Sequence, residues 1–168
     1  MTTYFTETNY EQAIIELFQN MGYSHLYGPN LERDYSSPVL EDTLFDCLVR
    51  INKNLPIEAI HETIAKLKNF DSGSLIQKNA AFMGYLQDGI EVKYFYKGEE
   101  RSSVVKLIDF NTVKNNTFEV VNQFTFIEGG NNRRPDIILF INGLPLVVIE
   151  FKSATRENAT IFNAYEQL

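Results

Sequence analysis

The chain has 168 residues, of which 44% are hydrophobic and 22% charged, and its formal net charge is −7 at pH 7. This length and composition are typical of one globular domain with a hydrophobic core, and no apolar run approaches the roughly 18 residues that a membrane-spanning helix requires. The acidic balance argues against tight independent binding to duplex DNA, because such binding depends largely on neutralising phosphates.

The N-terminus and the cysteine content indicate the expected compartment. The first residues show no basic region followed by an apolar stretch, so we expect no signal peptide. Cys47 is the only cysteine, and its apolar surroundings in segment 44–48 favour a buried small side chain over a nucleophile. We therefore expect a cytoplasmic protein with no membrane attachment.

The first half of the chain is predicted to be helical. Thr8 and Glu11 have the spacing of a capping box, and apolar residues follow at helical intervals as far as Gly22, a natural stop. After a loop around 28–30, a second helix is predicted to start near Pro38 and to end before Pro56. Further helices are predicted over 57–67 and 75–86.

From Gly89 onward the pattern indicates β-structure. Strands are predicted over 90–96, 103–110, 117–126, 137–141 and 146–149, and a closing helix over 159–168 is predicted to be capped within 155–158. This order predicts one domain over 1–168, of the α/β (α+β) class: a helical N-terminal portion, then a mainly antiparallel mixed sheet flanked by helices.

Asp136, Glu150 and Lys152 are the most informative residues. They lie at the outer ends of two consecutive strands that are joined by a turn at Asn142-Gly143. Two carboxylates can supply oxygen ligands to Mg²⁺, and the backbone carbonyl of the residue after Glu150 could add another. Lys152 projects from the same strand face as Glu150, where it can orient water or stabilise charge on a phosphate.

Strand register decides whether this site exists. A strict two-residue loop would pair Asp136 with Ile149, so that Asp136 and Glu150 point to opposite faces. A three-residue loop, a glycine bulge at Gly143, or an equivalent bulge within the strands would place Asp136 opposite Glu150. We predict one of these bulged forms.

Acidic residues beside an Asn-Gly hairpin are also common on solvated sheet faces, so a purely structural interpretation stays open. Against it, the strands 137–141 and 146–149 are very apolar and are predicted to be central and covered on both faces. A charge within such a strand needs a partner or a metal ion. Glu11 borders the buried face of the first helix, where it is a candidate third metal ligand or, equally, a capping residue.

The sequence resembles the PD-(D/E)xK nucleases, and more widely the N-terminal nuclease domain of the motor (R) subunit of type I restriction enzymes. Blocks that carry this resemblance, in the same order, are segments 55–56, 107–110, 118–124, 142–146 and 157–160. The resemblance implies a Mg²⁺-dependent endonuclease that cuts double-stranded DNA, with Asp136, Glu150 and Lys152 carrying the chemistry and Glu11 as the first-helix acid. It also implies a catalytic glutamine, which Gln167 matches, although the tyrosine that follows it in the family is absent.

The resemblance also implies partners. R subunits continue into ATP-driven motor domains and work with modification and specificity subunits. No phosphate-binding loop of the Gly-x-x-x-x-Gly-Lys-Ser/Thr type occurs in this sequence. We therefore expect ATP to act only in a full-length enzyme, with this chain as an N-terminal fragment. The alternative function is a catalytically silent nuclease-fold module that docks onto a DNA-translocating complex.

Overall fold

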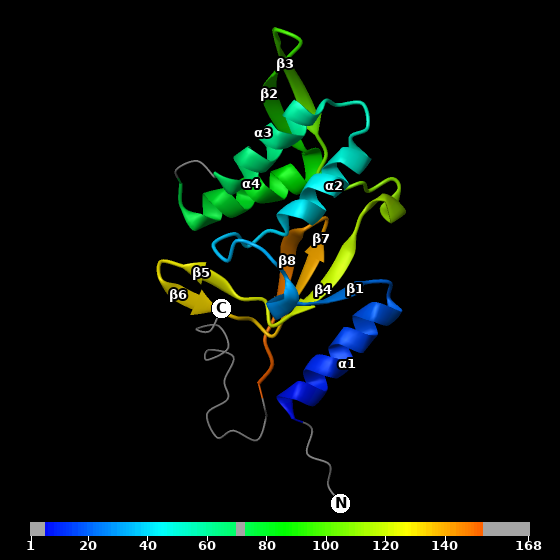
Figure 1. Ribbon diagram of the computed structural model, residues 1–168, viewed down its shortest axis with the longest axis vertical. Helices are drawn as coiled ribbons and strands as arrows, with labels where there is room; N and C mark the ends of the chain where they lie inside the picture. Colours follow the sequence, from blue (N-terminus) through cyan, green and yellow to red (C-terminus); the bar gives the residue numbers. More distant parts are fainter. Residues whose placement is uncertain (1–5, 70–72, 153–168) are drawn as a thin grey trace, which may run out of the picture. The chain divides into compact units, whose positions relative to one another are not determined.

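The computed structural model describes residues 6–69 and 73–152 (Figure 1). The chain divides into two compact units: unit 1 comprises Met1–Val39 with Phe118–Leu168, and unit 2 comprises Leu40–Thr117. The described residues form both helices and several small sheets, which confirms the predicted mixed α/β class. The single domain over 1–168 stays a prediction. Among the described residues, no helix combines the length and the apolar character needed to cross a bilayer.

Unit 1 is built on a four-stranded mixed sheet with the order β1-β4-β7-β8. Its strands are β1 (Ser24–Tyr27), β4 (Phe118–Asn122), β7 (Ile137–Ile141) and β8 (Leu144–Ile149). β1 runs parallel to β4, and the other neighbouring pairs are antiparallel. Helix α1 (Glu7–Asn20) buries Ile15 in one cluster with Val120, Ile137 and Leu139. The helix is thereby fixed beside the strands that carry the candidate site.

The N-terminus of α1 differs from the prediction. Thr6 is the N-cap: its hydroxyl accepts a hydrogen bond from the Asn9 N–H at 3.3 Å, and Oδ1 of Asn9 accepts one from the Thr6 N–H at 3.0 Å. The predicted capping box of Thr8 and Glu11 is therefore wrong, because an asparagine fills the third helical position in place of glutamate. Glu11 takes no part in this cap and is available for contacts with the sheet.

The β7–β8 hairpin has a two-residue turn and a bulge inside β8. Asn142 and Gly143 both have positive φ, at 53° and 78°, as a tight hairpin turn requires. Phe140 then pairs with Pro145, but Leu139 pairs with Val147, so Leu146 is the extra residue. The bulge predicted as an alternative within the strands is thus found, whereas the three-residue loop is not.

Two features of the sheet were predicted incorrectly. β8 is the last strand of the sheet among the described residues, and Val147 and Val148 are 45% and 44% exposed, so β8 is not covered on both faces. Val147 and Val148 pair regularly with Leu139 and Ile138, so their side chains point to opposite faces of the sheet, and β8 is partly open to solvent on both faces. In addition, segment 24–27 forms the short strand β1, which its mixed polar sequence did not reveal.

The strand predicted over 117–126 stops at Asn122. Gln123 adopts a left-handed backbone conformation with φ of 54°, which turns the chain out of β4. A second small hairpin follows, formed by β5 (Phe126–Glu128) and β6 (Asn131–Arg133). The short 3₁₀ helices are η1 (Gly28–Asn30), which follows β1, and η2 (Val113–Asn115) in unit 2.

Unit 2 contains helices α2 (Glu41–Ile51), α3 (Ile57–Lys68) and α4 (Leu75–Asp88), and the hairpin of β2 (Ile90–Tyr96) and β3 (Glu99–Val105). Ile90, Val92 and Tyr94 are buried on the face of β2 that packs on α3. α2 starts later than predicted, because Ser37 and Pro38 lie in the irregular segment between η1 and α2. β3 spans 99–105 and not 103–110, because β2 and β3 are joined by a tight turn at Lys97-Gly98.

Candidate functional site

The bulged register brings Asp136 and Glu150 together. Ile137 pairs with Ile149, so the next position outward on each strand is Asp136 and Glu150. The Asp136 N–H lies 3.4 Å from Oε2 of Glu150, and the Phe151 N–H donates a hydrogen bond of 2.7 Å to Oδ2 of Asp136. The two carboxylates therefore meet where the described part of β7 and the chain after β8 run side by side.

Lys152 joins the same group. Its Nζ lies 3.2 Å from Oε1 of Glu150, and the side chains of this ion pair are 24% and 13% exposed. The pair is thus largely withdrawn from solvent, where electrostatic interactions are stronger than on an open surface. The structure therefore brings together Asp136, Glu150 and Lys152, the three residues that the sequence singled out.

Asp136 experiences an unfavourable environment for its negative charge. Burial raises the pKa of its carboxyl above the ordinary value, and the neighbouring carboxylates of Glu150 and Glu11 raise it further. The hydrogen bond from the Phe151 N–H and the charge of Lys152 lower this pKa, but they do not cancel the increase. A carboxylate that is held among other acids in a partly buried site is typical of a functional position.

Glu11 reaches the site from α1. Nδ2 of Asn122 donates a hydrogen bond of 2.7 Å to Oε1 of Glu11, and Nε2 of Gln123 lies 3.3 Å from Oε2. Because Glu11 raises the pKa of Asp136, its charge acts at the site. No role was predicted for these two amides from the sequence, although they follow one another at the end of the strand that precedes Asp136.

The donor set suits a hard divalent cation. Asp136 and Glu150 supply carboxylate oxygens, and Mg²⁺ is commonly held by one or two carboxylates with several waters. The mutual repulsion that raises the pKa of Asp136 is the kind that a bound cation would relieve. Across residues 6–69 and 73–152, no three His, Cys, Asp or Glu side chains stand close enough to form a metal cluster by themselves. Gln167 lies outside the described residues.

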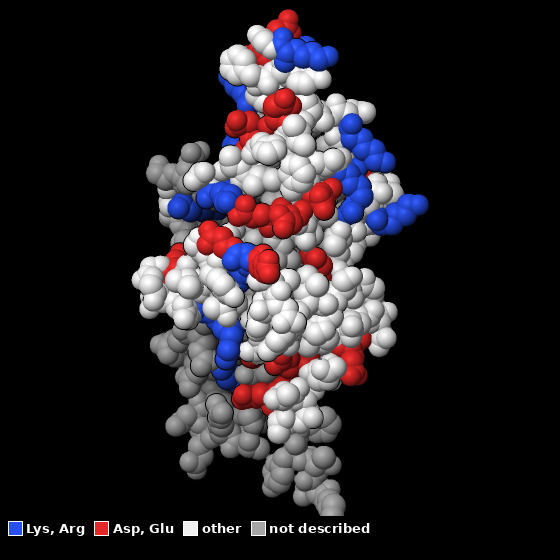
Figure 2. All heavy atoms as spheres, viewed as in Figure 1, with Lys and Arg blue, Asp and Glu red and all other residues white. Residues whose placement is uncertain are grey.

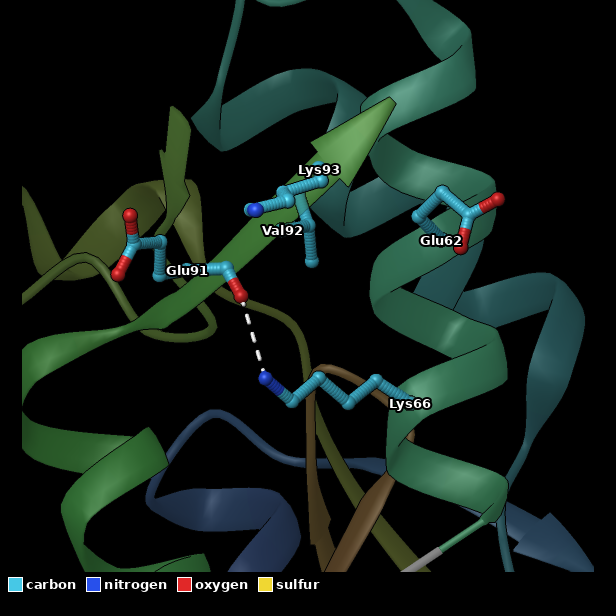
Figure 3. Close-up of a pocket in the computed structure, with 5 residues that line it drawn as sticks. All are labelled: Glu62, Lys66, Glu91, Val92 and Lys93. Atoms are coloured by element: carbon cyan, nitrogen blue, oxygen red, sulfur yellow. Dashed lines mark hydrogen bonds between the residues drawn. The ribbon is translucent and has the colours of Figure 1, made fainter. Parts of the chain in front are cut away.

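A pocket in unit 2 is chemically different. About 480 Å³ in volume, it is lined by Glu62 and Lys66 of α3 and by Glu91, Val92 and Lys93 of β2 (Figure 3). Nζ of Lys66 donates a hydrogen bond of 3.2 Å to the backbone carbonyl of Glu91. Acidic and basic side chains are balanced there, and none of the candidate catalytic residues lines this pocket.

Charge on the visible surface is mixed. On the face drawn in Figure 2, the Lys and Arg side chains of the described residues are interspersed with Asp and Glu and form no continuous basic surface. This agrees with the net charge of −7. Strong sequence-independent affinity for duplex DNA would require a basic footprint.

Comparison with known proteins identifies the family. The family model described as "Type I restriction enzyme R protein N terminus" matches residues 4–168. The chain is 35% identical over 96% of its length to the type I restriction enzyme HindI endonuclease subunit of Haemophilus influenzae. It is 32% identical over 92% of its length to the putative type I restriction enzyme MjaIXP endonuclease subunit of Methanocaldococcus jannaschii.

These relatives are much longer proteins, and the chain spans 16% of the length of each. The similarity covers both compact units, since the matched range includes the whole of Leu40–Thr117. The predicted family is thereby confirmed: the chain belongs to the N-terminal region of type I restriction enzyme R proteins, the endonuclease subunits of these enzymes.

Proposed function

We propose that this chain is a Mg²⁺-dependent endonuclease domain that hydrolyses phosphodiester bonds of double-stranded DNA. The observation that carries the proposal is the convergence of Asp136, Glu150 and Lys152 on one site. Two carboxylates and one ammonium group there have the composition expected for metal-assisted hydrolysis. Family membership is independent support, because the relatives are named as endonuclease subunits.

Each residue has a defined task in this proposal. Asp136 and Glu150 hold the ion, whose bound state would supply Lewis-acid polarisation of the phosphate and a water of lowered pKa. The Phe151 N–H orients the carboxylate of Asp136, with which it forms a hydrogen bond of 2.7 Å. Lys152, a compact donor 3.2 Å from Glu150, orients the attacking water or stabilises charge that develops on the phosphate.

The partners follow from the acidic charge and from the family. A chain with a net charge of −7 needs another component to bring DNA to it. The proposed components are ATP-driven motor domains of the same subunit and the modification and specificity subunits of a restriction complex, in the cytoplasm. Cleavage would then follow translocation and would not depend on base recognition by this chain. Gln167 is retained in the proposal as an additional catalytic residue.

Calorimetric titration tests the metal site directly. The wild-type chain and the Asp136→Ala variant are each titrated with Mg²⁺ and with Mn²⁺, and Glu100→Ala, an exposed acid on β3, serves as the control. Binding by wild type and Glu100→Ala, with loss in Asp136→Ala, supports the proposal. Absence of binding in all three proteins would contradict the metal site and favour the second candidate, a catalytically silent docking module, which the net charge of −7 supports.

A further inference from the structure

Glu11 is held from two sides by amide groups at the end of β4. Nδ2 of Asn122 lies 2.7 Å from Oε1, and Nε2 of Gln123 lies 3.3 Å from Oε2 and 3.5 Å from Oε1. Both oxygens of one carboxylate therefore have a donor. Asn122 is 9% exposed, so its hydrogen bond is shielded from water. This arrangement fixes the plane of the carboxylate as well as its position.

The orientation of the Asn122 amide is determined by its partners. An ionised carboxylate only accepts hydrogen bonds, so the NH₂ group of Asn122 must face Glu11. Oδ1 then faces Nε2 of His25, 2.9 Å away, and the imidazole must be the donor. Three elements, β1, β4 and α1, are linked by this chain of contacts. The direction of every hydrogen bond in it is set by the acid at its end.

Gln123 occupies a backbone conformation that its side chain does not favour. Its φ of 54° is in the left-handed region, which glycine adopts with little strain but residues with a Cβ do not. Its N–H donates a hydrogen bond of 3.1 Å to the carbonyl of Asp136. A Cβ on Gly28 would lie 2.6 Å from the carbonyl oxygen of Gln123. The main chain of Gln123 therefore lies between the first residue of η1 and the residue that precedes β7.

Such strain persists only where the surrounding structure holds the residue in place, and it is common at functional sites. Here, the left-handed turn is what places the amide of Gln123 beside Glu11 while its main chain stays bonded to Asp136. A glycine would satisfy the backbone and would remove the amide. The residue type thus serves the contact with Glu11, and the backbone alone does not explain it.

We propose that Asn122 and Gln123 are positioning residues that fix the carboxylate of Glu11 as an additional negative charge beside the metal-binding pair of Asp136 and Glu150, without making Glu11 a metal ligand. This inference rests on the proposed function. It assigns a role to two amides that make no contact with substrate themselves. Without them, the Glu11 side chain would rotate freely on the surface of α1, and the charge at the site would be carried by Asp136 and Glu150.

The decisive variant is Gln123→Gly, because it removes the amide and relieves the backbone. Mn²⁺ affinity is measured by calorimetry, and thermal unfolding is measured without metal. We expect Mn²⁺ to bind about 10-fold more weakly, as is typical when a group that supports a metal site from outside its ligands is lost. The unfolding temperature should not fall. Asn122→Ala should weaken binding by a similar factor. Gln12→Ala, which removes the amide–carboxylate contact to Glu16 on α1, is the matched control and should bind as wild type.

A double-mutant cycle separates positioning from general stability. In a Glu11→Ala background, neither Gln123→Gly nor Asn122→Ala should weaken binding further, because the group that they orient is gone. The inference is overturned if Gln123→Gly binds Mn²⁺ as tightly as wild type, or if its loss of affinity persists in the Glu11→Ala background. In either case, Asp136-dependent binding of Mn²⁺ by wild type would still support the proposed function. A wild-type chain that binds no Mn²⁺ overturns both.

Discussion

The main-chain N–H of Phe151 donates a 2.7 Å hydrogen bond to Oδ2 of Asp136, across the open end of the β7–β8 hairpin. The donor belongs to the residue between Glu150 and Lys152. One backbone contact therefore couples the position of Asp136 to both neighbours of Phe151. The geometry of the three-residue group depends on the hairpin staying in its bulged register.

The first prediction concerns the charge of Asp136. Its pKa is raised in the folded chain, chiefly by burial and then by Glu150 and Glu11. A raised pKa in the folded state means that folding favours the protonated carboxyl. This contribution to the free energy of unfolding is complete below the unfolded pKa and is lost as pH rises through the folded pKa. Ionised Asp136 therefore lowers the free energy of unfolding at neutral pH. Asp136→Asn, which cannot ionise, should raise it in metal-free buffer.

Chemical denaturation at a series of pH values measures this effect. The advantage of Asp136→Asn should be present at pH 7 and should vanish near about pH 3, below the ordinary pKa of an aspartate. Glu100→Gln, at an exposed position of β3, should show no comparable dependence on pH. An Asp136→Asn variant less stable than wild type at neutral pH would show that the carboxylate is favourably solvated.

The second prediction concerns Lys152. In a full-length restriction enzyme that carries this chain, Lys152→Ala should reduce DNA cutting by about 100-fold or more, because it removes a charge that acts on the reacting groups. ATP hydrolysis should persist, since the proposed motor domains are separate from this chain. Supercoiled-plasmid cleavage and phosphate release measure the two activities. Lys68→Ala, which breaks an exposed ion pair with Glu41 in unit 2, is the control. Undiminished cutting by Lys152→Ala would remove this residue from the mechanism.

The third prediction compares two glycines. A Cβ on Gly28 would lie 2.6 Å from the Gln123 carbonyl oxygen, so Gly28→Ala should push the start of η1 away from Gln123 and lower the free energy of unfolding by about 1–3 kcal/mol. A Cβ on Gly84 in helix α4 would meet no atom within 4 Å. Gly84→Ala should therefore stabilise the chain by about 0.5–1 kcal/mol. Denaturant unfolding of both variants checks the signs, and equal effects would contradict the close approach.

The fourth prediction concerns the reactivity of Cys47. Its side chain is 1% exposed, and its sulfur lies 3.2 Å from Oγ1 of Thr117. A thiol reagent should therefore label it only as fast as unit 2 opens, and labelling should accelerate steeply in denaturant. A cysteine introduced at the exposed Ser102 should react at once in a Cys47→Ala background. Rapid labelling of native Cys47 would show that α2 opens readily.

The sequence was most informative about the hairpin. Side chains alternate between the two faces of a strand. With a turn at Asn142-Gly143, Asp136 could therefore lie opposite Glu150 only with a longer loop or a bulge, and a bulge is present at Leu146. Its place could not be derived, because a turn bulge and a strand bulge satisfy the same pairing. The burial of β8 was misjudged for a related reason: hydrophobicity alone does not distinguish a central strand from an edge strand that contains a bulge.

The sequence allowed Glu11 to be predicted as a candidate, but not the residues that contact it. Helical periodicity placed Glu11 at the border of the buried face of α1, which was sufficient to nominate it. Asn122 and Gln123 were read as the middle of a strand, since nothing local indicates that Gln123 takes a left-handed φ of 54°. That conformation depends on β1 lying alongside β4, a parallel pairing between segments that are nearly a hundred positions apart in the sequence.

The division of the chain has a consequence for how such enzymes diversify. Unit 2 is one uninterrupted stretch, Leu40–Thr117, set between two stretches of unit 1, and every acid, amide and amine discussed for cleavage is in unit 1. Replacing that insert, or shortening it to a brief connection between Val39 and Phe118, alters no residue of the proposed catalytic group. Natural variation or engineering could thus change the insert while the residues proposed for cleavage are inherited unchanged.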